Sequence, residues 1–325
     1  MARKPTVEKG EPGPAPPAAD PVRRLEAGVY PGIPADVYHA DPAPEPSLSS
    51  SIAAILLQRS PAHAWHAHPR LNPDFELTND PKFDLGKAAH AVLIENREPV
   101  GVEFEDWRTK LARERRAEIL AAGGLPLLLP QFHQVQEMVA AARLQLAMTE
   151  EAADIFDGEA EGETTIVWCE NCWCRMRPDW LQRSSRYLID YKTCNDASFP
   201  AIAGHLYAIG ADLQSEFYRR GARATFGEDF EYRFVCQEIR PPYALSIIGL
   251  SPQAQELAQG EVAQALEIWT RCLAENRWPA YPARTSWIDA PGWIAKQMEN
   301  AAIQRDLDAA AGVDAFELAI QLYRR

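Results

Sequence analysis

The chain has 325 residues and a formal net charge of −13, so it can bury a large core but has no overall positive charge with which to bind nucleic acid. No run of about 18 apolar residues is present, which excludes a predicted membrane span. The opening segment "MARKPTVEKGEPGPAPPAAD" lacks the apolar core of a secretory signal, and six cysteines suit a reducing compartment, so we expect a cytoplasmic protein.

Three regions are predicted from composition. Residues 1–27 hold six prolines and almost no large apolar side chains, which is typical of a disordered tail. A folded domain is expected over residues 28–283. Residues 284–325 contain two stretches with helical apolar patterns, so we expect a C-terminal helical extension. A helix packed on its own domain is the simpler interpretation of the last stretch, with a docking or oligomerisation helix as the alternative.

The first half of the domain is predicted to be helical. A serine cluster before Ile52 indicates a capped helix that stops before Pro61. Further helices are expected over residues 83–96, 106–124 and 129–148.

The second half changes to a pattern of strands. Residues 162–170 and 171–181 are predicted to form two strands joined by a tight hairpin, and residues 186–193 a third strand. A helix over residues 202–221 follows, with Leu206, Ile209, Leu213 and Phe217 as its core stripe. Two strands over residues 230–250, broken at two prolines, precede a long helix over residues 251–276 that begins with Ser251 as its cap. This order predicts an α/β fold.

The segment "RMRPDWLQRSSRYLIDYKTC", residues 175–194, has an unusual charge pattern. Side chains alternate across a strand, so Asp190 and Lys192 share one face, while Ile189 and Tyr191 share the other. A buried strand rarely carries an acid and a lysine on one face unless they are paired or functional. Taken alone, the pattern fits a plain ion pair at a strand end equally well.

A second acid makes the functional interpretation stronger. Asp179 follows Pro178, and a short loop would bring its strand antiparallel to the strand of Asp190. Two converging carboxylates repel each other unless a cation lies between them, and Mg²⁺ prefers such oxygen ligands, with Mn²⁺ as an alternative. The backbone carbonyl of Tyr191 is a candidate further ligand. Lys192 would orient or activate a water, and this set can hydrolyse a phosphodiester bond.

This arrangement of PD, a spacer and D-x-K resembles the PD-(D/E)XK nuclease superfamily. The resemblance implies an α/β restriction-endonuclease-like core, with a central mixed sheet flanked by helices and extra N-terminal helices. His90, in "GKAAHAVLIE", looks like the helical histidine that helps to ligate the metal in the RecB and RecE branch. Glu163 resembles the glutamate that opens the first strand in that branch. The simpler interpretations are a structural histidine and an exposed acid.

The helix after D-x-K carries a further motif. Gln214 and Tyr218 are four residues apart, on one helical face, and look like the Q-x-x-x-Y motif that positions the DNA or the lysine in RecB-type domains. Arg219 and Arg220 follow directly and are candidate phosphate contacts. Arg175 and Arg177, on the predicted face of Asp179, are equal candidates.

Residues 28–295 resemble phage RecE-type exodeoxyribonucleases. The matching segments include "GVYPGIPADVYHA", "DWRTKLARERRAEILAAGGLPLL" and "RWPAYP". The resemblance implies a metal-dependent exonuclease that degrades one strand of linear double-stranded DNA, 5′ to 3′, in DNA recombination. It also implies a single-strand annealing protein as partner and a ring-shaped homo-oligomer. The alternatives are an endonuclease or junction-processing enzyme of the same fold, and a non-catalytic DNA-binding or recombinase-recruiting protein.

The cysteines of "WCENCWCR" form a C-x-x-C-x-C pattern. Cys169, Cys172 and Cys174, with Cys194 as a fourth candidate, could suggest a zinc or iron–sulfur site. Their place in a predicted hairpin favours ordinary buried thiols.

Overall fold

The computed structural model describes residues 24–76, 85–149 and 161–312. Contacts divide the chain into residues 1–280 and residues 281–325. Leu25, which falls in the predicted tail, is 6% exposed, and its amide donates to the carbonyl of Pro42. In the second unit, helix α10 spans Gly292–Ala310, and the predicted element after residue 312 lies outside the described residues. None of the helices described here is both long and apolar enough to cross a membrane.

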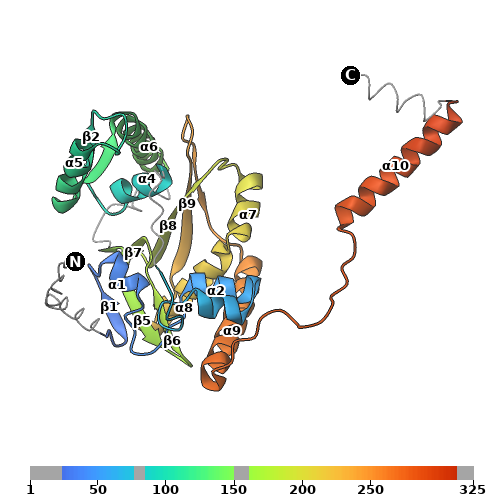
Figure 1. Ribbon diagram of the computed structural model, residues 1–325, viewed down its shortest axis with the longest axis horizontal. Helices are drawn as coiled ribbons and strands as arrows, with labels where there is room; N and C mark the ends of the chain where they lie inside the picture. Colours follow the sequence, from blue (N-terminus) through green and yellow to red (C-terminus); the bar gives the residue numbers. More distant parts are fainter. Residues whose placement is uncertain (1–23, 77–84, 150–160, 313–325) are drawn as a thin grey trace, which may run out of the picture. The chain divides into compact units, whose positions relative to one another are not determined.

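A five-stranded mixed sheet lies at the centre of the first unit (Figure 1). Its strand order is β10-β9-β8-β7-β4, with β8 and β9 parallel and the other pairs antiparallel. The strands are β4 (Glu161–Gly162), β7 (Trp180–Gln182), β8 (Tyr187–Cys194), β9 (Glu231–Glu238) and β10 (Leu245–Ile248). The central mixed sheet flanked by helices is therefore confirmed.

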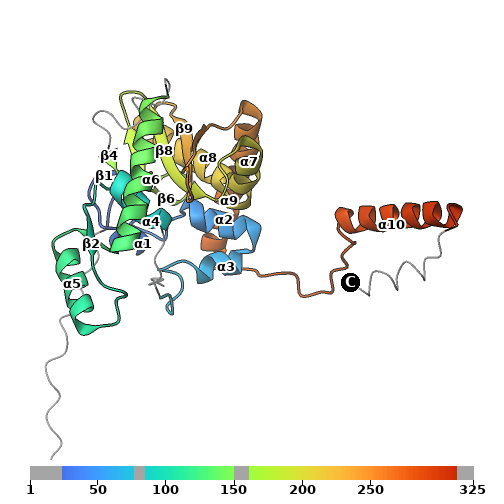
Figure 2. The same ribbon diagram turned by 90° about the horizontal axis from the view of Figure 1, so that it is seen from above.

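Two apolar clusters cover the two faces of this sheet. Leu188 of β8 packs in one cluster with helices α2, α7, α8 and α9, whereas Ile189 and Tyr191 pack in the other with α4 and α6. Figures 1 and 2 both show α4 and α6 across β8 and β9 from α7 and α8. The helices are α2 (Ser50–Gln58), α4 (Leu85–Leu93), α6 (Leu129–Ala147), α7 (Phe199–Ala208), α8 (Ala211–Phe226) and α9 (Pro252–Glu275). The core has three layers, helix–sheet–helix.

The serine caps and the N-terminal helices agree with the sequence patterns. The hydroxyl of Ser49 accepts from the amide of Ile52 at the start of α2, and Ser251 caps α9 in the same way. Pro61 begins another helix rather than only ending one. The N-terminal half of the chain also contains the helices α1 (Ala35–His39), α3 (Pro61–His66) and α5 (Lys110–Ala121). Two strands in this half, β2 (Pro99–Val102) and β3 (Leu125–Leu128), form a parallel pair.

The predicted single strand over residues 171–181 is wrong. It is two strands, β6 (Trp173–Met176) and β7, separated at Arg177, Pro178 and Asp179. The strand β6 pairs with β5 (Thr165–Cys169), which pairs with β1 (Gly28–Tyr30) in a separate three-stranded sheet. Pro178 lacks an amide donor and cannot continue a ladder, so the chain changes sheets there.

The predicted single helix over residues 202–221 is also two helices. It breaks at Gly210, whose φ of 69° lies in the left-handed region that glycine adopts readily. Leu206, Leu213 and Phe217 are buried as expected, but Ile209, beside the break, is 46% exposed. The break lets α7 and α8 take different directions along the sheet.

Helix α8 lies very close to the three-stranded sheet at Gly221. A Cβ there would lie 2.8 Å from two ring carbons of Trp168 and 2.9 Å from the sulfur of Met176, both of which are buried. We therefore expect Gly221→Ala to lower the free energy of unfolding by about 1–3 kcal/mol through overpacking. Gly260, exposed in the middle of α9 with nothing near its added Cβ, is the matched control. Gly260→Ala should raise stability by up to about 1 kcal/mol, and urea unfolding of both variants checks the pair. Equal stabilisation by both substitutions would contradict the close packing of α8.

Candidate active site

Strand β8 places an acid and a lysine on one face of the sheet. Asp190 is 1% exposed, and its Oδ2 lies 2.7 Å from Nζ of Lys192. Burial raises the pKa of Asp190, and the nearby ammonium opposes this rise. Burial lowers the pKa of Lys192, but the charges of Asp190 and Asp179 outweigh it and raise the pKa, so Lys192 is an ammonium. The ion pair expected as the simpler interpretation is therefore real, and the residues around it decide whether it also has a functional role.

Gln214 of α8 bridges this pair. Its Nε2 donates to Oδ1 of Asp190 at 3.0 Å, and its Oε1 accepts from Nζ of Lys192 at 3.1 Å. The amide therefore fixes the position of both charged groups from the helix side. Of the two roles implied for Gln214, positioning of the lysine is the one that this geometry supports.

Asp179 lies at the junction between β6 and β7, beside β8. Its Oδ2 accepts from the amide of Tyr191 at 2.7 Å, and its Oδ1 lies 3.3 Å from Nε2 of His90. The antiparallel register of β7 and β8 pairs Trp180 with Ile189, which brings the residues before and after them together. Asp179 and Asp190 consequently line the same cavity, of about 330 Å³.

His90 faces three carboxylates from its place on α4. Its Nε2 lies 3.3 Å from Asp179 and 3.6 Å from Glu163, and its Nδ1 lies 3.3 Å from Glu95. Burial disfavours the imidazolium. The hydrogen bonds to Asp179 and Glu95 and the surrounding negative charge outweigh burial and raise the pKa of His90 to about 10. Without a bound metal, this histidine thus acts as the cation among the acids.

Glu163 is held in an uncommon backbone conformation between β4 and β5. Its φ of 53° lies in the left-handed region, which costs a non-glycine residue roughly 1–3 kcal/mol. Its amide donates to the carbonyl of Asp179 at 3.1 Å, and its carboxylate pairs with the guanidinium of Arg177. Burial raises the pKa of Glu163, and Arg177 opposes this rise. A strained backbone that aims an acid at other charged groups is typical of a functional site.

Tyr218 and Tyr191 contribute mainly to the framework. The hydroxyl of Tyr218, a residue that is 5% exposed, donates to the carbonyl of Arg177 at 3.3 Å, and burial raises the pKa of Tyr218 to about 12. It lines the cavity of the two aspartates. The hydroxyl of Tyr191 donates to Gln237 on the other face of the sheet, and its amide binds Asp179. The role of the Tyr191 carbonyl as a metal ligand stays a prediction.

Arg219 is not brought into this cluster. Its guanidinium donates to the carbonyl of Phe230 and to the side chains of Glu216 and Gln255, beside a different cavity. Its predicted contact with DNA is not supported at this site. Arg175 is 4% exposed, and its guanidinium contacts Asp41 and Ser47, so this arginine stabilises the protein interior.

The donors of this site fit a divalent cation. One ligand atom each of His90, Glu95 and Glu163 lies within 4.8 Å of the others, and Asp179 contacts the same imidazole. Carboxylates with one imidazole are suitable ligands for Mg²⁺ or Mn²⁺. Within the described ranges, the cysteines form no comparable group: Cys169 is exposed, and the sulfurs of Cys172 and Cys174 lie 3.9 Å apart in the core.

Two residues of this cluster were missed or misjudged from sequence. Glu95 lies just beyond the end of α4, five positions after His90, where helical spacing does not predict a contact. Arg177 was expected at most to contact DNA, but it pairs with Glu163 and donates to the carbonyl of Ile33. The sequence signal for a role of Arg177 in this cluster was its position two residues before Asp179, with Pro178 between them.

Comparisons with known proteins agree with the fold. The family model of a PDDEXK-like domain of unknown function (DUF3799) matches residues 49–290. Among solved structures, a protein of Eubacterium rectale described as a "putative exonuclease" is similar, with a TM-score of 0.53, 13% identity, and coverage of 80% of this chain and 95% of that one. A second structure, SSO0001, has a TM-score of 0.22 and 18% identity, with coverage of 55% of this chain and 84% of that one. No curated protein matches by sequence.

Proposed function

The chain belongs to the family of PDDEXK-like domains of unknown function (DUF3799), and on that premise we propose that it is a Mg²⁺-dependent exodeoxyribonuclease acting on linear double-stranded DNA. The observation that carries the proposal is the convergence of Asp179, Asp190 and Lys192 on one cavity, with His90 and Gln214 in direct contact with these residues. A simple structural ion pair would not need the other acids, the imidazole and the bridging amide around it.

The proposal gives each side chain a role. Asp179, Asp190 and His90 would hold the cation, with Glu163 and Glu95 as additional donors. When bound, a divalent cation lowers the pKa of its water and offsets charge on the phosphate. The Lys192 ammonium, fixed by Asp190 and Gln214, would orient the attacking water and offset negative charge that develops on the phosphate.

We extend the proposal to a RecE-type role on the basis of the sequence motifs. The enzyme would degrade the 5′-ended strand and expose a 3′ strand for a single-strand annealing protein, as a ring-shaped homo-oligomer. Digestion of a linear duplex labelled at one end tests the polarity. An uncut covalently closed circle distinguishes this activity from that of an endonuclease.

Cation binding should depend steeply on pH. His90 must lose its proton to become a ligand, and its pKa is about 10 in the cation-free protein. The proton therefore competes with the cation at all lower pH values, and the affinity falls as the pH falls. We expect Mn²⁺ to bind roughly tenfold more tightly at pH 8 than at pH 7, measured by isothermal titration calorimetry.

Two variants control this measurement. His90→Ala should weaken Mn²⁺ binding and remove most of the pH dependence. His133→Ala, an exposed histidine of α6, should keep both the affinity and the slope. Equal pH dependence in the His90 variant would show that another group carries the proton.

A further inference from the structure

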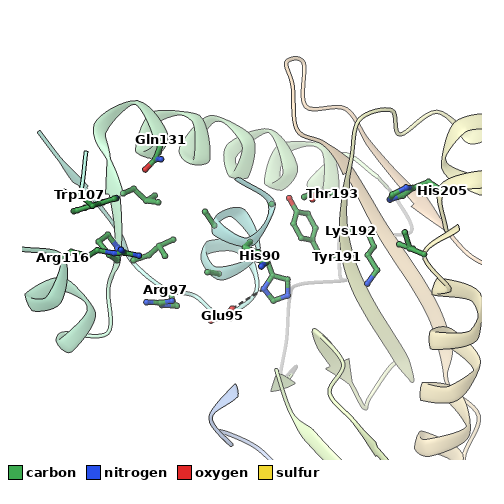
Figure 3. A pocket seen from close by; sticks show the side chains of 18 residues that line it. His90, Glu95, Arg97, Trp107, Arg116, Gln131, Tyr191, Lys192, Thr193 and His205 are labelled. Carbon is green, nitrogen blue, oxygen red and sulfur yellow. Dashed lines mark hydrogen bonds and ion pairs between the residues drawn. The ribbon is translucent and has the colours of Figure 1, made fainter. Parts of the chain in front are cut away.

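A second, larger cavity of about 960 Å³ adjoins the candidate active site. It lies between the sheet and the segment formed by α4, α5 and β3, and Lys192 lines both this cavity and the cavity of the aspartates. Figure 3 shows Trp107 and Arg116 on the wall opposite Lys192, with His90 and Glu95 between the two walls. A ligand at the candidate active site can therefore extend into this space.

The charge of this cavity is opposite to that of the chain. Among the residues that the structure describes, its lining has the basic side chains of Lys87, Arg97, Arg116 and Lys192, with His90 beside them, against one carboxylate, that of Glu95. The chain as a whole has 46 acidic residues and only 33 lysines and arginines. A locally basic lining in an acidic protein favours an anionic ligand, and low-dielectric walls strengthen that preference.

An aromatic platform lies in the same wall. The indole of Trp107 is partly exposed, and the guanidinium of Arg116 lies 5.5 Å from its ring centre. Arg97 donates to the carbonyls of Gly123 and Gly124 and so ties the loop after α4 to the turn between α5 and β3. Basic groups interleaved with an aromatic ring are the features by which proteins hold unpaired nucleotides.

We propose that this cavity is a subsite for unpaired nucleotides of single-stranded DNA. A base stacks on Trp107, and the adjoining phosphate contacts Arg116, while the strand continues past Lys192 to the aspartates. An unpaired strand is favoured over a duplex because an indole can stack only on a base face that a neighbouring base leaves open. The inference rests on the proposed nuclease function and adds where the substrate strand runs.

The test measures binding without hydrolysis. Full-length protein in EDTA is titrated into a fluorescein-labelled oligothymidylate of about ten nucleotides, and anisotropy gives the Kd. Trp107→Ala should weaken binding on the order of tenfold, and Trp107→Phe, which keeps a stacking ring, should restore most of it. Arg116→Gln should also weaken binding and reduce the slope of log K against log[salt] by about 0.7.

A matched control is the neighbouring Arg115, which pairs with Glu118 and does not line the cavity. Arg115→Gln should keep the Kd and the salt slope of the wild type. Wild-type affinity in both the Trp107→Ala and Arg116→Gln variants would overturn the subsite. Tighter binding of a blunt duplex than of the oligothymidylate would overturn the preference for an unpaired strand.

A measurement on the wild type covers the case in which a variant misfolds. An oligothymidylate containing 5-iodouracil is cross-linked by irradiation, and the peptides are mapped by mass spectrometry. A cross-link in the peptide of Trp107 supports the subsite, and cross-links only outside the cavity contradict it. Failure of the wild type to release nucleotides in Mg²⁺ would instead reject the nuclease function. The binding measured in EDTA would still decide whether the cavity holds unpaired nucleotides.

Discussion

Lys192→Met is expected to lose hydrolysis of linear duplex DNA by about 100- to 10,000-fold while the protein still binds Mn²⁺. The ammonium lies 2.7 Å from Asp190 and 3.1 Å from Gln214, so it is held in one position beside the carboxylates. Its removal deletes the group that orients water but leaves the cation's oxygen donors in place. The two measurements are release of acid-soluble nucleotides and calorimetric titration with Mn²⁺.

The control for Lys192→Met is a lysine outside the site. Lys110 on α5 is 87% exposed and pairs with Glu114, so Lys110→Met should keep the wild-type rate. A Lys192→Met enzyme with the wild-type rate would remove the lysine from the proposed chemistry. Loss of Mn²⁺ binding in the same variant would mean that Lys192 supports the fold of the site rather than the reaction.

Asp190→Asn is expected to lose both hydrolysis and Mn²⁺ binding. The rate should fall on the order of 10³-fold or more, because a cation contributes several kcal/mol of transition-state stabilisation. The substitution also leaves Lys192, a 24% exposed side chain, without its carboxylate. We therefore expect a lower melting temperature as well, with a modest shift because solvent reaches the ammonium.

Asp229→Asn provides the matched control for this variant. Asp229 is 70% exposed and pairs with Arg223 at the surface, so its loss should change neither rate nor cation affinity. Retention of Mn²⁺ binding by Asp190→Asn would place the cation at His90 and the remaining acids, Asp179, Glu95 and Glu163. Retention of hydrolysis would remove Asp190 from the site altogether.

The sequence correctly predicted the features that interactions between residues close in the chain decide, such as strand alternation and helix caps. The alternation in β8 placed Asp190 and Lys192 on one face and Ile189 and Tyr191 on the other, and the two apolar clusters confirm that division. Ser49 and Ser251 marked the starts of two helices because a hydroxyl cap acts within three residues.

The errors came where tertiary contacts decide the outcome. A helical pattern over residues 202–221 hid the break at Gly210, since the apolar spacing continues across it. The sequence shows Pro178 between the two strands. The change from one sheet to another at this proline, however, depends on which strands are neighbours in the fold. Glu95 contacts His90 only because the chain turns back after α4, and spacing within a helix carries no such information.

Digestion of a linear duplex labelled at either end tests the central claim most directly. With Mg²⁺, the wild-type protein should release labelled nucleotides progressively from the 5′ ends, leave a covalently closed circle intact, and lose the activity in EDTA. The Asp190→Asn protein should release none under the same conditions. A wild-type protein that retains the duplex but releases no nucleotide in Mg²⁺ would contradict a catalytic role, and a cut circle would contradict an exonuclease.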